Sequence, residues 1–112
     1  MNIREDGYLL RITVGENDKL GHVPLYEAIV LKARDARLAG ATVIRGVMGF
    51  GRNSVVHTAK ILRLSENMPM TIEIVDAIER IEAFLPLLDG MLTGGLVTVE
   101  KVRAIRYGAG GQ

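Results

Sequence analysis

The residues best suited to chemistry lie in the segment 46–52, where three glycines precede one arginine and Asn53 follows. Glycine lets main-chain N–H groups approach an anion closely, and the fork of an arginine such as Arg52 can bind phosphate through two hydrogen bonds. The segment therefore predicts an anion-binding loop after a strand, although a tight turn packed without a ligand fits the same residues. It has neither the spacing of a P-loop nor the strand-to-helix setting of a dinucleotide fingerprint.

Basic residues continue beyond this segment with no acid among them, namely Arg52, His57, Lys60 and Arg63. A charge pattern of this kind favours the binding of anions. The pattern of residues 53–68 is mixed, and long segments of that kind inside compact domains are usually functional. We therefore expect a functional loop over residues 50–68.

The sequence offers little to a catalytic or metal site. Cysteine is absent, and His22 and His57 are the two histidines, which are too few ligands for a metal centre. Ser54 precedes His57 closely, which by itself is weak support for a serine hydrolase. We expect no catalytic residue, no metal and no cofactor.

The elements that position these residues are expected to form one packed domain over residues 1–112. With 48% hydrophobic and 24% charged residues, the chain is too apolar for a disordered protein. A formal net charge of +1 gives little attraction to nucleic acid, so we expect no nucleic-acid partner. The absence of Cys, of an export signal and of an apolar run of ~20 residues predicts a cytoplasmic protein.

Alternating and helical spacings predict four strands and two helices. Strands are expected over residues 8–14, 41–48, 70–75 and 96–107, and helices over residues 24–39 and from residue 77. Residues 15–23 are expected to be irregular, because they are rich in Gly, Asn and Asp.

Particular residues predict where the helices begin, end or bend. Gly40 is expected to end the first helix in the left-handed conformation, and Asp76 with Glu79 to form a capping box for the second. Pro86 predicts a kink or a restart near Leu85. Residues 108–112 are expected to form a mobile tail.

The order β-α-β-β-α-β is that of an α+β, ferredoxin-like fold, in which both helices cover one face of an antiparallel sheet. We expect the spatial strand order four, one, three, two. The other face keeps apolar residues, which predicts an oligomer that buries them, for example Leu9, Ile44, Val75 and Val102. On that face charges are expected to alternate across the sheet in the order Glu100 or Lys101, Arg11, Glu73 and Arg45.

Several segments together resemble one family over roughly residues 9–107. They are Tyr26-Glu27-Ala28, Ala39-Gly40-Ala41-Thr42, Gly49-Phe50-Gly51, His57-Thr58-Ala59-Lys60, residues 64–69, and the ending Arg106-Tyr107-Gly108. In these segments the chain resembles the PII-like signalling proteins, and in particular the bacterial family catalogued as domain of unknown function 190.

The resemblance implies a homotrimer that binds adenine nucleotides in clefts between subunits and grips a transporter, channel or enzyme with a long loop. Genes of the family often lie near fluoride-exporter genes, so a membrane channel of that type is an implied partner. Carried over by position, the implied ligand-binding residues are Gly49, Phe50, Gly51 and Arg52 at the loop base, Gly94 and Gly95 in a phosphate-cradling turn, and the terminal Arg106. The implied partner-binding residues are Asn53, His57, Lys60 and Arg63.

Two departures from the family pattern bear on the ligand. Residues 93–96 lack the Asp and Lys of the PII phosphate turn, and Ala104 stands where the first of two terminal arginines is expected. Both an adenine nucleotide and a smaller or less charged anion are therefore compatible with the sequence as ligands. We expect a non-catalytic sensor of a small anion. The alternatives are a ligand-independent interaction module, a CutA-like metal-binding trimer and an acylphosphatase-like enzyme.

Overall fold

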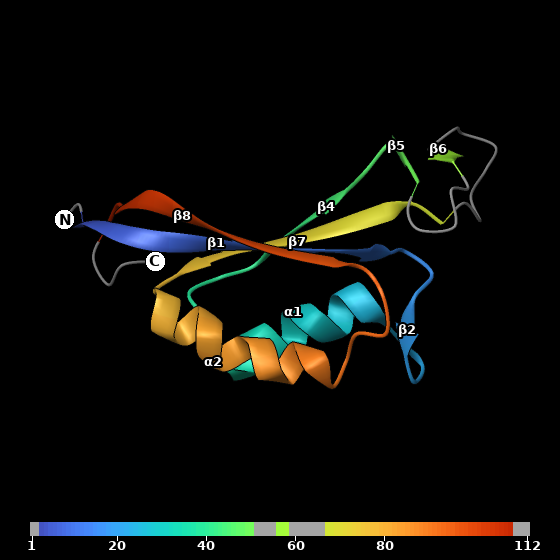
Figure 1. Ribbon diagram of the computed structural model, residues 1–112, viewed down its shortest axis with the longest axis horizontal. Coiled ribbons are helices and arrows are strands. Elements are labelled where there is room, and N and C mark those ends of the chain that lie inside the picture. Colours follow the sequence, from blue (N-terminus) through green and yellow to red (C-terminus); the bar gives the residue numbers. More distant parts are fainter. Residues whose placement is uncertain (1–2, 51–55, 59–66, 109–112) are drawn as a thin grey trace.

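The computed structural model describes residues 3–50, 56–58 and 67–108, which form two layers (Figure 1). One layer is an antiparallel sheet in the order β4-β7-β1-β8, and helices α1 and α2 cover one of its faces. The sheet strands are β1 (Ile3–Gly15), β4 (Thr42–Arg45), β7 (Pro69–Asp76) and β8 (Leu96–Arg106), and the helices are α1 (Leu25–Asp35) and α2 (Ile78–Asp89). This arrangement confirms the ferredoxin-like fold and the expected strand order.

The core lies between the sheet and the helices. Burial alternates along β7, and β1 likewise buries Leu10, Ile12 and Val14 while the residues between them face away from the helices. From the other layer, each helix contributes one apolar stripe, namely Leu25, Ile29 and Ala33 in α1 and Ile81, Phe84 and Leu88 in α2. Each large side chain buried here stabilises the fold by roughly 1.5–3 kcal/mol. Because burial of these residues drives folding, the period of two in the strands and of 3.6 in the helices predicted the sheet layer and the helix layer correctly.

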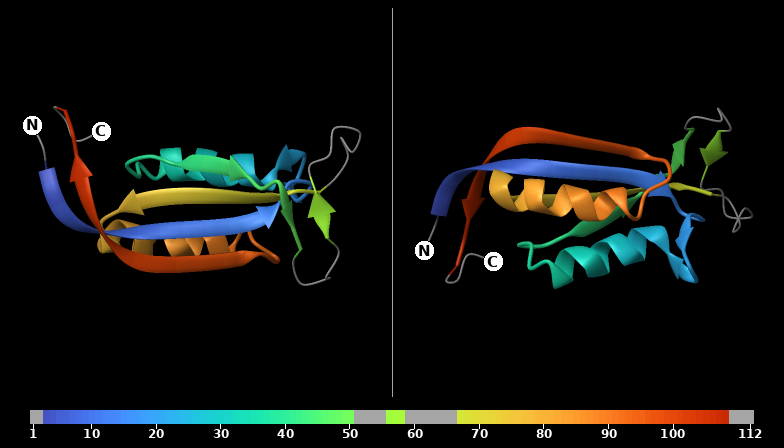
Figure 2. Two further views of the ribbon diagram at one scale, coloured as in Figure 1. Left: turned by 90° about the horizontal axis from the view of Figure 1, so that it is seen from above. Right: turned by 60° about the horizontal axis from the view of Figure 1, so that its bottom comes forward.

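Strands β1 and β8 are longer than the rest of the sheet. Their pairing runs from Ile3↔Arg106 to Thr13↔Leu96, whereas β7 pairs with β1 only between Tyr8 and Gly15. The expected first strand of residues 8–14 was therefore too short, because β8 continues to supply partners to residues 3–7. Figure 2 shows this two-stranded ribbon curving away from the other strands at its end.

The end of α1 differs from the expectation, because Gly40 is not the left-handed residue. Arg37 takes that conformation, with φ 62°. The amide of Leu38 donates to the carbonyl of Ala33 at 3.1 Å, and the amide of Arg37 donates to that of Arg34 at 3.0 Å. These bonds form a Schellman motif, and Leu38 packs against the core, so the helix ends earlier than residue 39.

The predicted capping box of α2 was wrong, and so was a restart of the helix near Leu85. Asp76 and Glu79 do not form a capping box, because the N-cap residue is Ala77 and no side chain caps the helix. The Asp76 carboxylate instead accepts hydrogen bonds from the amides of Ala77 and Ala39. Helix α2 also does not restart at Pro86, which lies inside one continuous helix.

Two short hairpins stand outside the main sheet. Residues 15–23, expected to be irregular, lead into a hairpin of β2 (Lys19–Leu20) and β3 (Val23–Pro24). The expected strand 41–48 divides into β4 and β5 (Met48–Gly49), and β5 pairs with β6 (His57–Thr58). The division falls at Gly46, where a Cβ would lie only 2.6 Å from Pro69, so the chain passes Pro69 closely and leaves the sheet.

Candidate functional site

The sheet face opposite the helices carries a row of charges at its centre. Arg11 Nε donates to Glu73 Oε2 at 2.9 Å, and Arg11 Nη1 lies 3.7 Å from Glu100 Oε1. These three residues come from adjacent strands in the register that pairs Arg11 with Glu73 and Leu9 with Glu100. The expected alternation of charge is confirmed across β8, β1 and β7.

The prediction that Arg45 is the fourth member of that row was wrong. The register of β4 and β7 places Thr42, not Arg45, opposite Glu73. Arg45 lies opposite Met70 at the end of its strand, and its Nε donates to Glu16 Oε2 at 3.0 Å. Three positions separate Thr42 from Arg45, and an odd separation turns a side chain to the other face of a strand.

Apolar side chains surround the charges on this open face. Leu9, Val75 and Val102 are half-buried, and Ile44 is 50% exposed. Leu96, in register with Thr13 at the start of β8, is 63% exposed. Within one chain the face therefore leaves a substantial apolar surface in contact with water.

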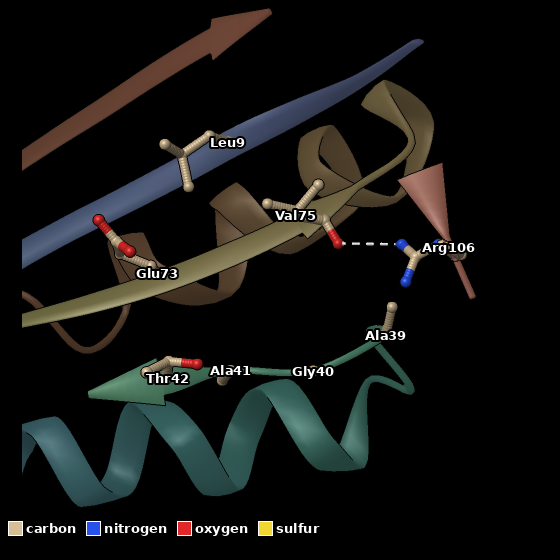
Figure 3. Close-up of a pocket in the computed structure, with 8 residues that line it drawn as sticks. All are labelled: Leu9, Ala39, Gly40, Ala41, Thr42, Glu73, Val75 and Arg106. Atoms are coloured by element: carbon tan, nitrogen blue, oxygen red, sulfur yellow. Dashed lines mark hydrogen bonds between the residues drawn. The ribbon is translucent and has the colours of Figure 1, made fainter. Parts of the chain in front are cut away.

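A pocket of about 280 Å³ lies at the β4–β7 side of the open face. Its lining residues come from four segments and are Leu9, Ala39, Gly40, Ala41, Thr42, Glu73, Val75 and Arg106. In Figure 3, the side chains from β1 and β7 form one wall, and the connection between α1 and β4 forms the opposite wall. The pocket therefore offers apolar contact, one carboxylate, one hydroxyl and one guanidinium.

Arg106 closes one end of this pocket. It belongs to β8, which pairs with β1 rather than with β7, yet its Nη2 donates to the carbonyl of Val75 at 3.4 Å. The curvature of the β1–β8 ribbon brings the guanidinium across to β7, where Figure 3 places it beside Ala39. The group is half-buried, so it retains access to solvent and to a ligand.

Ala39, the first residue of the opposite wall, bonds to a buried carboxylate. The amide of Ala39 donates to Asp76 Oδ2 at 2.9 Å, and Asp76 is 7% exposed. Gly40, Ala41 and Thr42 themselves are exposed. The wall therefore lies on the surface, but its first residue is hydrogen-bonded to a buried side chain.

The glycines expected to bind a ligand lie elsewhere. Gly49 is in β5, where a Cβ would contact Pro69 at 3.2 Å, and Phe50 beside it is 68% exposed. Gly95 has φ 98°, and a Cβ there would lie 2.6 Å from the carbonyl oxygen of Thr13, so this turn requires glycine. Gly94 has open space around its Cβ position.

The predicted ligand-binding residues thus fall into two groups. The turn at Gly95 precedes β8, whereas Arg106 ends it, and the 11 residues of that strand span roughly 33 Å at ~3.3 Å per residue. In Figure 1 the β5–β6 hairpin likewise lies at the end of the molecule opposite the two termini. One chain therefore does not bring Arg106 together with the glycine turns.

The remaining predicted residues lie outside the described part of the chain. They are Gly51, Arg52, Asn53, Lys60 and Arg63. His57 belongs to β6 through its backbone pairing with Gly49. The expected tail falls almost entirely outside the described residues as well.

Of the residues that line the pocket, sequence reasoning named only Arg106 as a ligand contact and missed the other seven, namely Leu9, Ala39, Gly40, Ala41, Thr42, Glu73 and Val75. Strand alternation had placed Leu9, Glu73 and Val75 on the open face, and residues 39–42 were part of a segment that carried the resemblance. The alternation could have suggested that Leu9, Glu73 and Val75 share a surface, because residues of like parity in paired strands lie side by side. No local pattern indicates that Arg106 reaches them.

The described residues offer neither a metal-binding cluster nor a membrane-spanning helix. Those residues contain no group of three or more His, Asp or Glu side chains able to hold a metal ion, and His22 is exposed. In the same part of the chain, neither helix has the length and hydropathy needed to cross a membrane.

Comparison by sequence identifies one family and its relatives. Residues 7–104 match the model of the family DUF190, described as Uncharacterized ACR. A UPF0166 protein of Aquifex aeolicus (strain VF5) is 34% identical over 97 residues, which cover 87% of this chain and 91% of that protein. The UPF0166 protein MJ1524 of Methanocaldococcus jannaschii is 35% identical over 92 residues, covering 81% and 84%.

Solved structures share the fold at low sequence identity. A protein of Thermus thermophilus described as PII-like signaling has a TM-score of 0.67 at 15% identity, covering 90% of this chain and 91% of that one. CPII, a nitrogen regulatory PII-like protein from Thiomonas intermedia K12 bound to ADP, AMP and bicarbonate, has a TM-score of 0.62 at 16% identity, covering 91% of both. CutA from Synechococcus elongatus PCC7942 has a TM-score of 0.60 at 12% identity, covering 94% and 83%.

Proposed function

The chain belongs to the DUF190 family and has a PII-like fold, and from this premise we propose that it is a non-catalytic signalling protein. It binds a small anionic effector, in the first instance an adenine nucleotide, in clefts between the subunits of a homotrimer. Occupancy is reported to a partner through the loop of residues 50–68. The partner is a membrane transporter or channel, and the protein acts on it from the cytoplasm as a single domain of residues 1–112.

The pocket beside Arg106 is the observation that carries this proposal. A guanidinium at one end attracts an anionic group, while Leu9 and Val75 suit an apolar or aromatic group. Glu73 is ion-paired with Arg11, which reduces its repulsion of an anion. A ligand with one flat apolar part and one negative part fits this set of residues.

The separation of the predicted site residues supports a cleft between subunits. Arg106 and the turn at Gly95 lie at opposite ends of β8, so a ligand that contacts both needs a second copy of the chain. The apolar open face supplies a reason for copies to associate, since burying it removes Leu9, Ile44 and Val102 from water. In such a trimer the pocket of one chain faces the glycine turns of another.

The loop would convert binding into a signal. An anion held by Arg52 and by the main-chain N–H groups of the neighbouring glycines would favour one conformation of residues 53–68. Asn53, His57, Lys60 and Arg63 then present donors and positive charge to the partner. Because the bound anion favours this loop conformation, the protein docks on its partner only when the ligand is present.

Calorimetric titration with ADP and AMP tests the proposal. CPII, which shares the fold, holds both nucleotides in its structure, and this guides the choice of probes. Arg106→Ala and Arg52→Ala should each weaken binding roughly tenfold to a hundredfold, because a hydrogen bond to a charged group contributes about 1.5–3 kcal/mol. Heat from neither nucleotide at millimolar concentration would remove the nucleotide from the proposal.

Arg103→Ala is the matched control for this titration. Arg103 lies on the same strand as Arg106, is exposed, pairs across the ladder with Asp6 and does not line the pocket. Its removal takes away one positive charge from β8 and should leave the affinity for ADP nearly unchanged. An equal loss in both variants would indicate general electrostatic attraction rather than a site.

A ligand-independent interaction module is the second candidate, and the exposed apolar residues near β5 favour it. Val47 is 74% exposed, Met48 64% and Phe50 68%, which is unusual for large apolar side chains so close together. A constitutive docking surface would use them directly. Capture of the transporter from membranes in equal yield with and without ADP supports this candidate.

A further inference from the structure

Asp76 is the one buried charged side chain among the residues that the structure describes, with 7% exposure. Its Oδ1 accepts from the amide of Ala77 at 2.8 Å. Its Oδ2 accepts from the amide of Ala39 at 2.9 Å and from Nε of Arg80 at 3.2 Å. A buried carboxylate is costly unless such bonds satisfy it, so its position needs an explanation.

The bond to Ala39 joins two segments that are 37 residues apart in the sequence. Ala39 begins the exposed stretch that forms one wall of the pocket, and β4 beyond it is a four-residue edge strand. Short edge strands and exposed connections open easily, because few contacts hold them. A charge-assisted bond at 2.9 Å is therefore a substantial part of what keeps this wall in place.

The residue before Asp76 has a related contact. The carbonyl of Val75 accepts from Arg106, while the carboxylate of Asp76 accepts from Ala39. Figure 3 shows Ala39 and the Arg106 guanidinium on facing sides of the same end of the pocket. Two consecutive residues at the end of β7 thus bond to two different sides of the pocket, and together these bonds fix the distance between Ala39 and Arg106.

We infer that Asp76 is a positioning residue for the ligand pocket: its carboxylate holds Ala39, and with it the wall of residues 39–42, at the distance at which the pocket accepts a ligand. The inference rests on the proposed function, because it assigns the pocket to ligand binding. Asp76 itself does not line the pocket, so its effect on a ligand passes through Ala39.

The test compares ADP affinity with local opening at Ala39 in the full chain. In Asp76→Ala, ADP binding should weaken roughly tenfold or more, because a lost bond to a charged group is worth at least about one tenfold step. Hydrogen exchange of the Ala39 amide, followed by NMR, should accelerate in the same variant. Asp76→Asn keeps one acceptor oxygen and should show intermediate changes in both measurements.

Phe84→Leu is the control for a merely structural effect. Phe84 is 1% exposed in the core and does not line the pocket, so this variant lowers global stability without removing the bond between Asp76 and Ala39. It should leave ADP affinity and Ala39 exchange near their wild-type values at temperatures where it is folded. Equal weakening of binding in Phe84→Leu and Asp76→Ala would overturn the inference.

The outcomes separate this inference from the proposed function. Wild-type ADP affinity in Asp76→Ala, or unchanged exchange at Ala39, overturns the positioning role and leaves the nucleotide proposal standing. If the wild-type chain binds neither ADP nor AMP, the nucleotide proposal fails, and Ala39 exchange alone decides whether Asp76 holds the wall. If Asp76→Ala does not fold, the same two readouts in Asp76→Asn decide, and wild-type behaviour in that variant overturns the role.

Discussion

The contribution of the Arg11 ion pairs to stability depends on whether other chains cover them. Its guanidinium bridges Glu73 and Glu100 on the neighbouring strands, and its side chain is 42% exposed in the single chain. Exposed pairs of this kind contribute roughly 0.2–1 kcal/mol. If further copies cover the open face, the same three groups become a buried cluster, and removing one member leaves an uncompensated charge.

We predict that Arg11→Met lowers the free energy of unfolding by about 3–5 kcal/mol, because the proposed trimer buries Glu73 and Glu100. Urea denaturation at fixed protein concentration measures the change. Lys101→Met is the matched control, since Lys101 lies 3.6 Å from Asp6 with both side chains more than 60% exposed. The control should cost less than about 1 kcal/mol. Equally small effects of both changes would mean that the open face stays in water.

At the scale of elements, helix ends were decided by packing rather than by the residues best suited to end a helix. Helix α1 ends in a Schellman motif with Arg37 at φ 62°, although glycine follows at position 40. Leu38 packs against the core, and this contact turns the chain before Gly40 is reached. Helix α2 similarly continues through Pro86, because Leu88 beyond it is buried.

Pro86→Ala should raise the free energy of unfolding by roughly 1–3 kcal/mol, since an interior proline costs a helix up to about 3 kcal/mol relative to alanine. Pro86 is exposed, so the change removes little packing. Chemical denaturation measures the gain. Ala83→Gly, at another exposed position of α2, should change stability in the opposite direction by about 1 kcal/mol. A loss of stability in Pro86→Ala would show that the helix depends on the proline.

The whole molecule presents two unlike faces. Helices cover one side of the sheet, whereas the other side exposes apolar residues around the charge cluster. The proposed trimer resolves this asymmetry by turning the open faces toward one another. It also brings Arg106 of one copy toward the glycine turns of another, which a single chain keeps at opposite ends.

Light scattering should therefore report about three times the 12.2 kDa mass of one chain. Ile44→Glu should dissociate the assembly, because it places a charge on the open face at a residue that is 50% exposed in the single chain. Leu31→Glu is the control, since Leu31 is 39% exposed on α1 and lies in the helical layer. A wild-type mass of one chain at micromolar concentration would contradict the trimer.

The sequence alone determined the fold class, the strand order, the buried faces of β1 and β7, and the pairing of Arg11 with Glu73. The elements and their buried faces follow from periods of two and 3.6 residues, which are local properties of the chain, and the strand order follows from the order of those elements in a ferredoxin-like fold. The alternation also placed Leu9 and Val75 on the open face. It did not indicate that they line a pocket, because that depends on what lies across from them.

Only the tertiary structure decided which residues form the pocket. Asp76 bonds to Ala39 rather than capping its own helix, and the partners are 37 positions apart. Arg106 reaches Val75 across 31 positions, because the β1–β8 ribbon curves over the sheet. Such contacts depend on the twist of the sheet and on where each connection passes, and these are set by the packing of the whole chain rather than by any segment of it.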